Sequence, residues 1–338
     1  MRPYDRRIAM RLYDTRIAMR PYDKRIAMRP YDRHIAMRLY DGNKQRYSIM
    51  TQPTENTTLS ALIKLLDEPD ELAFSLVQGQ IFSVGIDALD PLKEAMENTF
   101  DPLVQERINF IVSKLNQENL YVDFVNWLNL SSGDLLKGFI LVSKTQYPAL
   151  DEADIIMQIE QLKMDIWIEL HDNLTAFENV KVFNHILFDI HKFDGKASDK
   201  QAPQHSCINT FLESHNGSPL ALGILFIILS QKLGLPVYGV DLPQHFILAY
   251  LKDSGIGNSE EDDVLFYINP ANNGAVFTRH EIESYIRQLK IKPEKSFFAP
   301  CTNANIVRRL INSHIHSYNQ NGYPGKIEDL KNLLIAYE

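Results

Sequence analysis

The residues of this chain that could do chemistry gather around one histidine. His245 follows a Pro-Gln dipeptide, and Ser218 and Cys207 lie earlier in the same half of the chain. An imidazole beside a hydroxyl or thiol is the arrangement that activates a nucleophile for hydrolysis or acyl transfer. Ser218 and Cys207 are therefore the candidate nucleophiles, and His245 is the candidate base.

Each of these residues also has a structural interpretation. Ser218 directly precedes Pro219, and this pair is typical of a helix N-cap followed by the first helical residue. Cys207 suits a packed core as a small apolar side chain, and Cys301 lies in a linker with no partner motif. A histidine such as His245 is also found buried and hydrogen-bonded for structural reasons.

The remaining polar residues do not form a metal or cofactor motif. The chain has 10 histidines and 2 cysteines, with no H-E-x-x-H or C-x-x-C spacing. His314 and His316 are two positions apart on an expected helix, so they point in different directions. The acidic run 260–263 lacks the alternating ligands and central glycine of a calcium loop. We expect no metal and no cofactor.

The elements that must position these side chains can be inferred from the same region. Residues 218–234 read as one helix that is apolar on almost every side and therefore buried. Three short β-branched and aromatic runs follow at 237–242, 245–251 and 264–268, bounded by proline, glycine or an acidic loop. The order predicts an α+β fold in which a buried central helix packs against an antiparallel sheet.

That order resembles the transglutaminase-like superfamily and, more narrowly, the SirB family of bacterial transglutaminase-like proteins. The segments that carry the resemblance are GSPLAL, GLPV and LPQHF, followed by YINPANNGAVFTRHEI and NANIVRRLINSHIHSY. The resemblance covers nearly all of residues 57–338. It implies a helical, HEAT-like N-terminal domain at 50–178, a papain-like α+β domain at 179–300 and a TPR-like helical hairpin at 301–338.

The resemblance also implies a degenerate catalytic triad. The cysteine position of the superfamily falls at Pro219, and its orienting aspartate position falls at Asn269. Of the triad only His245 remains, in a pocket expected to include Gly217, Ser218 and Gln244, the last standing where the family usually has glycine. A non-catalytic role in binding or regulation follows; the alternative is a peptidase-like hydrolase or acyltransferase that uses a relocated nucleophile with His245.

The expected helical regions carry further predictions. Asp101 and Pro102 predict the start of a helix on which Arg107 faces solvent. Trp127 and Trp167 lie on apolar helical stripes, which indicates core packing for both. At the C-terminus two helices broken near residues 321–325 are too few for a solenoid groove. We expect this hairpin to dock on the α+β domain.

The first 45 residues are five copies of a basic nonapeptide that begins MRPYD or MRLYD. A period of nine gives no continuous stripe on a helix or on one face of a strand, and proline recurs, so we expect a disordered tail at 1–49. Met50 is an alternative native start. The other alternative is a tether for nucleic acid or an acidic partner.

Charge and composition restrict the class of partner. The net charge of the whole chain is −8. Residues 1–45 hold 12 basic and 5 acidic residues, so residues 46–338, the body of the chain, carry a net charge of −15. Such a body argues against nucleic acid as the main partner. Two cysteines and no apolar run near 20 residues indicate a cytoplasmic protein without a membrane span. The expected partner is a protein whose identity the residues do not give.

Overall fold

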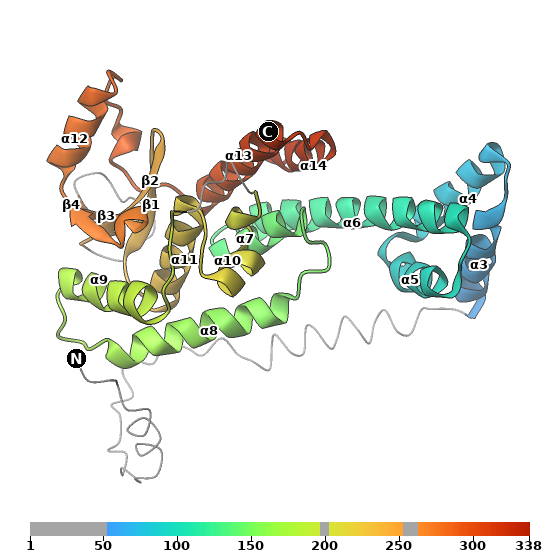
Figure 1. Cartoon of the computed structure of the whole chain (residues 1–338), viewed down its shortest axis with the longest axis horizontal. Coiled ribbons are helices and arrows are strands. Elements are labelled where there is room, and N and C mark those ends of the chain that lie inside the picture. The colour runs from blue at the N-terminus through green and yellow to red at the C-terminus, as the bar shows by residue number, and fades with distance from the viewer. Residues whose placement is uncertain (1–52, 197–202, 253–262) are drawn as a thin grey trace, which may run out of the picture. The chain divides into compact units, whose positions relative to one another are not determined.

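The computed structural model describes residues 53–196, 203–252 and 263–338 (Figure 1). The repeat tail at 1–49 and most of the acidic loop before residue 264 lie outside the described residues, so the expectations for them stay predictions. Contacts divide the chain into residues 1–64 and residues 65–338. In the first unit the described element is α3 (Pro53–Lys64).

The second unit begins with helices that start at aspartate N-caps. Asp70, Asp101, Asp134 and Asp151 each accept a hydrogen bond from a backbone N–H of the first helical turn. These caps satisfy donors that have no partner inside the helix. The α-helices of this part are α4 (Glu71–Val84), α5 (Leu89–Asn98), α6 (Pro102–Leu130), α7 (Leu135–Lys144), α8 (Glu152–Glu169) and α9 (Ala176–Asn184). A π-helical turn, η3 (His185–Ile190), ends α9.

Arg107 on α6 does not face solvent, and the prediction for it was wrong. Its side chain is buried, and its guanidinium donates to the carbonyl oxygens of Leu66 at 2.9 Å and Glu68 at 2.6 Å. It also lies 4.0 Å from the centroid of the Phe74 ring. Nη1 makes both bonds, to carbonyls at the end of the 3-10 turn η1 (Leu65–Asp67), and Nη2 donates to the Glu71 carboxylate at 3.2 Å.

The two tryptophans have opposite environments. Trp127 is buried as expected and donates its indole N–H to the Asp134 carbonyl oxygen at 2.8 Å. Trp167 is 59% exposed near the end of α8, so the prediction of core packing was wrong for it. Ile155, Ile159 and Ile166 fill the buried face of α8 instead. Other apolar residues of this helix, such as Met157 and Ile168, are exposed like Trp167, so an apolar side chain outside the buried stripe does not indicate core packing here.

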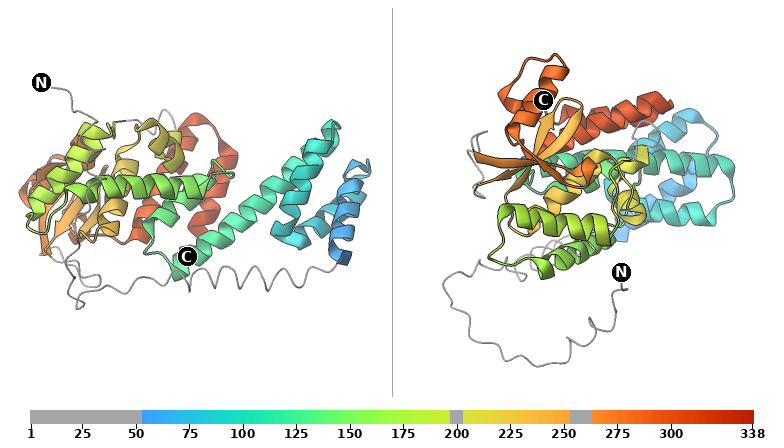
Figure 2. Two further views of the ribbon diagram at one scale, coloured as in Figure 1. Left: turned by 90° about the horizontal axis from the view of Figure 1, so that it is seen from below. Right: turned by 60° about the vertical axis from the view of Figure 1, so that its left-hand side comes forward.

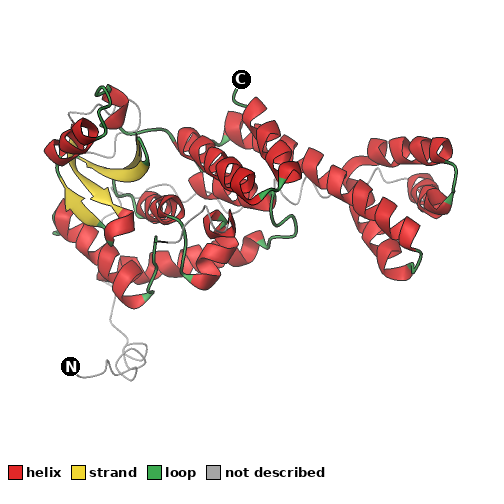
Figure 3. Ribbon diagram, turned by 45° about the horizontal axis from the view of Figure 1, so that its top comes forward, coloured by secondary structure: helices red, strands yellow, loops and turns green. Residues whose placement is uncertain are grey.

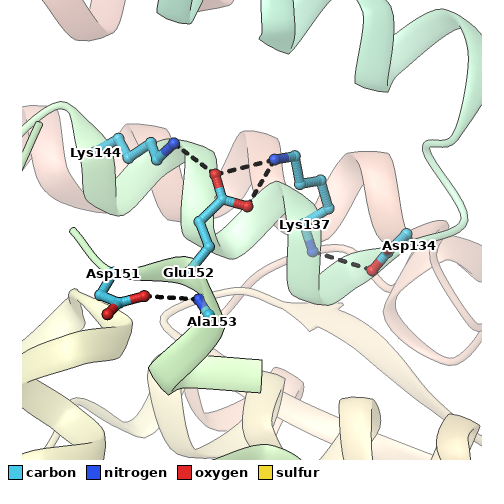
Figure 4. A network of polar contacts seen from close by, with 6 residues as sticks. All are labelled: Asp134, Lys137, Lys144, Asp151, Glu152 and Ala153. Carbon is cyan, nitrogen blue, oxygen red and sulfur yellow. Dashed lines mark hydrogen bonds and ion pairs between the residues drawn. The ribbon is translucent and has the colours of Figure 1, made fainter. Parts of the chain in front are cut away.

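A single carboxylate joins α7 to α8 (Figure 4). Glu152 accepts from the Lys137 ammonium at 2.9 Å and from the Lys144 ammonium at 2.5 Å. Burial acts to raise the pKa of Glu152, but the hydrogen bonds and charges of the two lysines outweigh it and hold the pKa below its usual value. These two ion pairs fix the position of the first residue of α8 relative to α7.

The α+β region follows the predicted order and confirms the fold class. Its helix α11 (Pro219–Lys232) is buried on nearly every side, with the Ser218 N-cap and the left-handed Gly234 at its two ends. The sheet, yellow in Figure 3, has the antiparallel order β1-β2-β3-β4. Its strands are β1 (Val237–Leu242), β2 (His245–Leu251), β3 (Val264–Asn269) and β4 (Ala275–Phe277). The three-residue β4 was not predicted because so short a run carries no alternation.

Both faces of the sheet are covered (Figure 1). Phe246, Leu248 and Tyr250 of β2 belong to the main core together with α11. Ile247, Ala249 and Leu251 belong to a second core, to which Ile282 and Ile286 of α12 (Arg279–Gln288) contribute. Successive side chains of a strand point to opposite faces, so β2 separates the α11 side from the α12 side.

The C-terminal hairpin packs against α7 and α6 of the helical region as well as against η4 (Pro203–Ser206) and β1, whereas we expected it to dock on the α+β domain alone. It consists of α13 (Asn303–Asn321) and α14 (Pro324–Ile335), the red helices in both views of Figure 2. His314 of α13 bonds the Ser206 carbonyl oxygen at 3.1 Å through Nε2, and Tyr318 donates to Gln146 Oε1 at 2.6 Å. Other short elements are α10 (Ile208–Ser214), η6 (Pro270–Asn272) and η7 (Lys295–Phe297).

By length and composition alone, one stretch among the described residues, Glu71–Asn98, could cross a membrane. It is not one continuous α-helix, because the 3-10 turn η2 (Gly85–Ala88) separates α4 from α5. The expected boundaries at 178/179 and 300/301 fall inside the compact unit formed by residues 65–338.

Candidate functional site

The beginning of α11 is the place where the superfamily resemblance puts a nucleophile. Here Ser218 is fully buried, and its hydroxyl oxygen accepts from the Ala221 N–H at 3.1 Å. The same hydroxyl shares a 2.7 Å hydrogen bond with the hydroxyl of Ser206. Ser218 therefore caps the helix and joins it to η4. Pro219 follows as the first helical residue and is exposed.

The chain is held tightly just before this cap. The Gly217 N–H donates to the Asp194 carbonyl oxygen at 2.9 Å. A Cβ at Gly217 would lie 2.3 Å from the Phe211 ring, so no larger residue fits without displacing that ring. Gly217 and Ser218 are thus packed parts of the interior.

The two cysteines are thiols in separate environments. Cys207 is fully buried and precedes α10, whose first N–H donates to the Ser143 hydroxyl at 3.0 Å. Cys301 donates its backbone N–H to the Gly239 carbonyl oxygen, and burial raises the pKa of its thiol to about 12. The thiolate is the reactive form of cysteine, so Cys301 is unreactive near neutral pH.

His245 and Gln244 lie in the tight turn between β1 and β2. Gln244 is exposed and adopts a positive φ of 65°, a conformation that glycine adopts without strain. The His245 side chain is exposed, and its ring meets the Tyr285 ring of α12 edge-on at 5.1 Å between centroids. Within the described residues no carboxylate pairs with His245.

The structure does not bring His245 and Ser218 together. Phe246, the next residue of β2, faces α11, since a Cβ added at Gly223 would lie 2.7 Å from its ring. His245 therefore faces the α12 side, and its contact with Tyr285 agrees with this. Ser218 and Pro219 belong to α11 on the other side of the sheet.

Asn269 lies at the end of β3. Ile268 packs in the core on the α11 side and Tyr267 in the core on the α12 side. Alternation then puts Asn269 on the α12 side, the same side as His245. Its carbonyl oxygen accepts from the Gly274 N–H at 3.0 Å. Of the predicted pocket, Gly217 and Ser218 lie in the interior, whereas Gln244 and His245 lie at the surface.

Sequence reasoning missed Arg309 of α13, which fixes the outer end of β1. Its guanidinium pairs with the Asp241 carboxylate, donates to the Leu242 carbonyl oxygen at 3.2 Å and lies 5.6 Å from the Phe246 ring centroid. Burial lowers its pKa to about 10. The signal was its position at the border of the apolar stripe that includes Ile306 and Leu310, where a long side chain can reach a packed neighbour.

Sequence reasoning also missed a histidine–carboxylate pair away from His245. His191 Nε2 lies 2.9 Å from Asp165 Oδ2, where both side chains are partly buried. The pair joins α8 to the loop after η3. In the described part of the chain no group of three or more His, Cys, Asp and Glu residues could hold a metal ion.

Comparisons with known proteins agree with the superfamily-level resemblance. Residues 153–312 match the family model described as "Transglutaminase-like superfamily". A UPF0162 protein of Xylella fastidiosa strain Temecula1 is 25% identical over 171 residues, which are 48% of this chain and 56% of that protein. A UPF0162 protein of Vibrio cholerae is 22% identical over 153 residues, 45% of this chain and 53% of that protein.

A further relative is human F-box only protein 21, which is 27% identical over 105 residues, 31% of this chain and 17% of that protein. The chain spans about half the length of the UPF0162 relatives it matches. No solved structure matches it. The narrower resemblance to the SirB family stays a prediction.

Proposed function

We propose that this chain is a non-catalytic transglutaminase-like protein of the SirB type that acts by binding or regulating a protein partner. The observation that carries the proposal is the separation of Ser218 and Pro219 from His245 by the sheet. General base catalysis needs the base within about 3 Å of the proton it removes, or one water away. A base on the other face of a packed sheet does not meet that requirement.

The electrostatics of the same residues support this function. Ser218 Oγ is already used by the Ala221 N–H and the Ser206 hydroxyl, and it is fully buried. Asn269 is an uncharged amide at the position where the superfamily has its orienting carboxylate. An imidazole without that carboxylate loses the group that would fix its tautomer and stabilise its protonated form.

The peptidase-like alternative requires Ser218 or Cys207 to act with His245. Cys207 is fully buried beside α7 and α13, near Tyr147 and Tyr318, whose pKa values are raised chiefly by burial and further by the neighbouring thiol. No described hydrogen bond connects Cys207 or Ser218 with His245. The geometry therefore favours the binding function.

The first test is turnover by the full-length protein. Hydrolysis of p-nitrophenyl acetate and release of ammonia from a glutamine-containing peptide should stay at the buffer rate, and His245→Ala should change neither rate. His280→Ala is the matched control, because His280 is also an exposed histidine on the α12 side of the sheet. Turnover above the buffer rate that disappears in His245→Ala and persists in His280→Ala would overturn the proposal.

A second test returns a thiol to the helix terminus. Pro219→Cys puts an exposed thiol at the first position of α11, where the helix dipole lowers thiol pKa values. We expect iodoacetamide to label this variant faster than the parent protein, whose cysteines are buried or of high pKa. We expect no turnover of either substrate. Turnover that depends on His245 would show that the imidazole reaches α11.

A further inference from the structure

A groove of about 580 Å³ lies between α6 and α14, with the end of α7 at its side. Its lining comes from residues 113–123 of α6, residues 144–148 at the end of α7 and just after it, and residues 326–335 of α14. All of these residues lie outside the stretch 153–312 that matches the transglutaminase-like model. The groove is therefore a feature that this family match does not describe.

Two hydrogen bonds join the three segments that line the groove. Gln117 of α6 donates its amide to Asp329 of α14 at 2.8 Å. Lys326 of α14 donates its ammonium to the Thr145 carbonyl oxygen after α7 at 2.6 Å. Burial raises the pKa of Asp329 above its ordinary value, and the nearby Lys326 and Lys114 counteract this. The groove is thus preformed by groups from all three segments.

Three carboxamides line the groove without being used by the fold. Asn116 and Asn119 on α6 and Asn332 on α14 are lining residues, and within the described residues their side chains make no hydrogen bond. Each carboxamide offers two N–H donors and a carbonyl acceptor. A peptide unit presents the complementary acceptor and donor, so asparagines along a groove can bind the backbone of an extended chain.

The charges of the lining are balanced. The lysines Lys114, Lys144 and Lys326 stand against the carboxylates Glu118, Asp123 and Asp329. Such a lining has no net attraction for a polyanion, which removes nucleic acid as the occupant. Tyr121 and Leu333 supply apolar surface between the polar groups. Mixed apolar walls with a few placed polar groups are typical of ligand sites of this volume.

The groove length sets the size of the occupant. Residues 113–123 advance about 15 Å along α6 at 1.5 Å per residue. An extended peptide rises about 3.3 Å per residue, so four to five residues span this length. We propose that the groove binds an extended segment of four to five residues from a partner protein, and that Asn116, Asn119 and Asn332 hydrogen-bond its backbone. This proposal rests on the binding function proposed above.

The test selects a binder and then asks which groups hold it. Seven-residue peptides displayed on phage are selected on the full-length protein, and the best sequence is synthesised with a fluorescent label. Fluorescence anisotropy then gives its Kd. We expect the double variant Asn119→Ala with Asn332→Ala to weaken binding at least tenfold, since two peptide hydrogen bonds are lost.

Matched controls separate the groove from the rest of α6. Asn126→Ala with Asn129→Ala removes two exposed asparagines of the same helix outside the groove, and we expect an unchanged Kd. N-methylation of the central peptide amides should also weaken binding at least tenfold, because it removes backbone donors and leaves the side chains. Circular dichroism verifies that each variant keeps its helical content and melting temperature.

Three results would overturn this proposal. They are failure to select any peptide, a Kd unaffected by the Asn119 and Asn332 changes, and equal loss in the Asn126 and Asn129 control. Turnover dependent on His245 would instead overturn the non-catalytic function and leave the groove titration unaffected, so the two failures are distinguishable.

Discussion

The Ser218 hydroxyl is a structural group in this protein, and its removal gives the most direct measure of that role. Ser218→Ala deletes the acceptor of the Ala221 N–H and one half of the contact with the Ser206 hydroxyl, both in the interior. Loss of an N-cap costs about 0.5–2 kcal/mol. A buried donor left without its partner costs about 1–3 kcal/mol. Because both figures describe largely the same lost bond, we expect about 2 kcal/mol.

Ser230→Ala is the matched control for this change. Ser230 lies on the same helix, is equally buried, and its hydroxyl oxygen has no hydrogen-bond partner among the described residues. Its removal deletes an unsatisfied polar group, so we expect no loss of stability or a slight gain. The two variants therefore make the same atomic change in the same helix with opposite expected consequences.

The assay is urea unfolding of the full-length protein followed by circular dichroism at 222 nm, with the midpoint and slope fitted for each variant. Ser206→Ala and the double variant complete a mutant cycle, in which we expect a coupling of about 1 kcal/mol between the two hydroxyls. Equal stability losses in Ser218→Ala and Ser230→Ala would refute the reasoning. So would an unchanged midpoint in Ser218→Ala, because the hydroxyl would then not be a cap.

Three further outcomes are expected. Gln244→Gly should stabilise the protein by about 0.5–1 kcal/mol, because glycine adopts the positive φ of 65° without strain. The gain is reduced by the greater conformational freedom of glycine in the unfolded chain. Thermal unfolding of this variant beside a Gln244→Ala control measures the effect. The pKa of Glu152 is lowered in the folded protein, so its contribution to stability is present above its unfolded pKa and is lost as pH falls through its folded pKa. Glu152→Gln should therefore flatten the acid side of the curve of unfolding free energy against pH, measured by urea titrations. Acrylamide should quench the emission of Trp167 and spare that of Trp127, and Trp167→Phe should remove most of the quenchable fluorescence; equal quenching before and after would contradict their exposures.

The order of elements around α11 could be predicted because its local signals agree. The Ser218-Pro219 start, the apolar run and the stop at Gly234 all indicate one buried helix, and the structure has it at 219–232. The three longer strands were predicted for a similar reason. Pro, Gly or acidic residues bound each β-branched and aromatic run.

The side of the sheet that His245 faces could not be predicted. After His245 every residue of β2 is buried, because α11 covers one face and α12 the other. A strand buried on both faces has no alternation of polar and apolar residues, so its sequence does not indicate which side chains share a face with a given helix. The exposure of Trp167 was missed for a different reason: α8 also carries exposed apolar residues such as Met157 and Ile168, so an apolar side chain on this helix does not by itself indicate burial.

The burial pattern of β2 has a consequence for mutational tolerance. Six of its seven residues fill cores on two sides, and His245 is the one exposed position of this strand. A saturation library along β2 should therefore lose folded protein at 246–251 and keep it at 245, where most side chains cost less than about 0.5 kcal/mol. The position that the superfamily resemblance associates with chemistry is, in this chain, the one that packing leaves open to substitution.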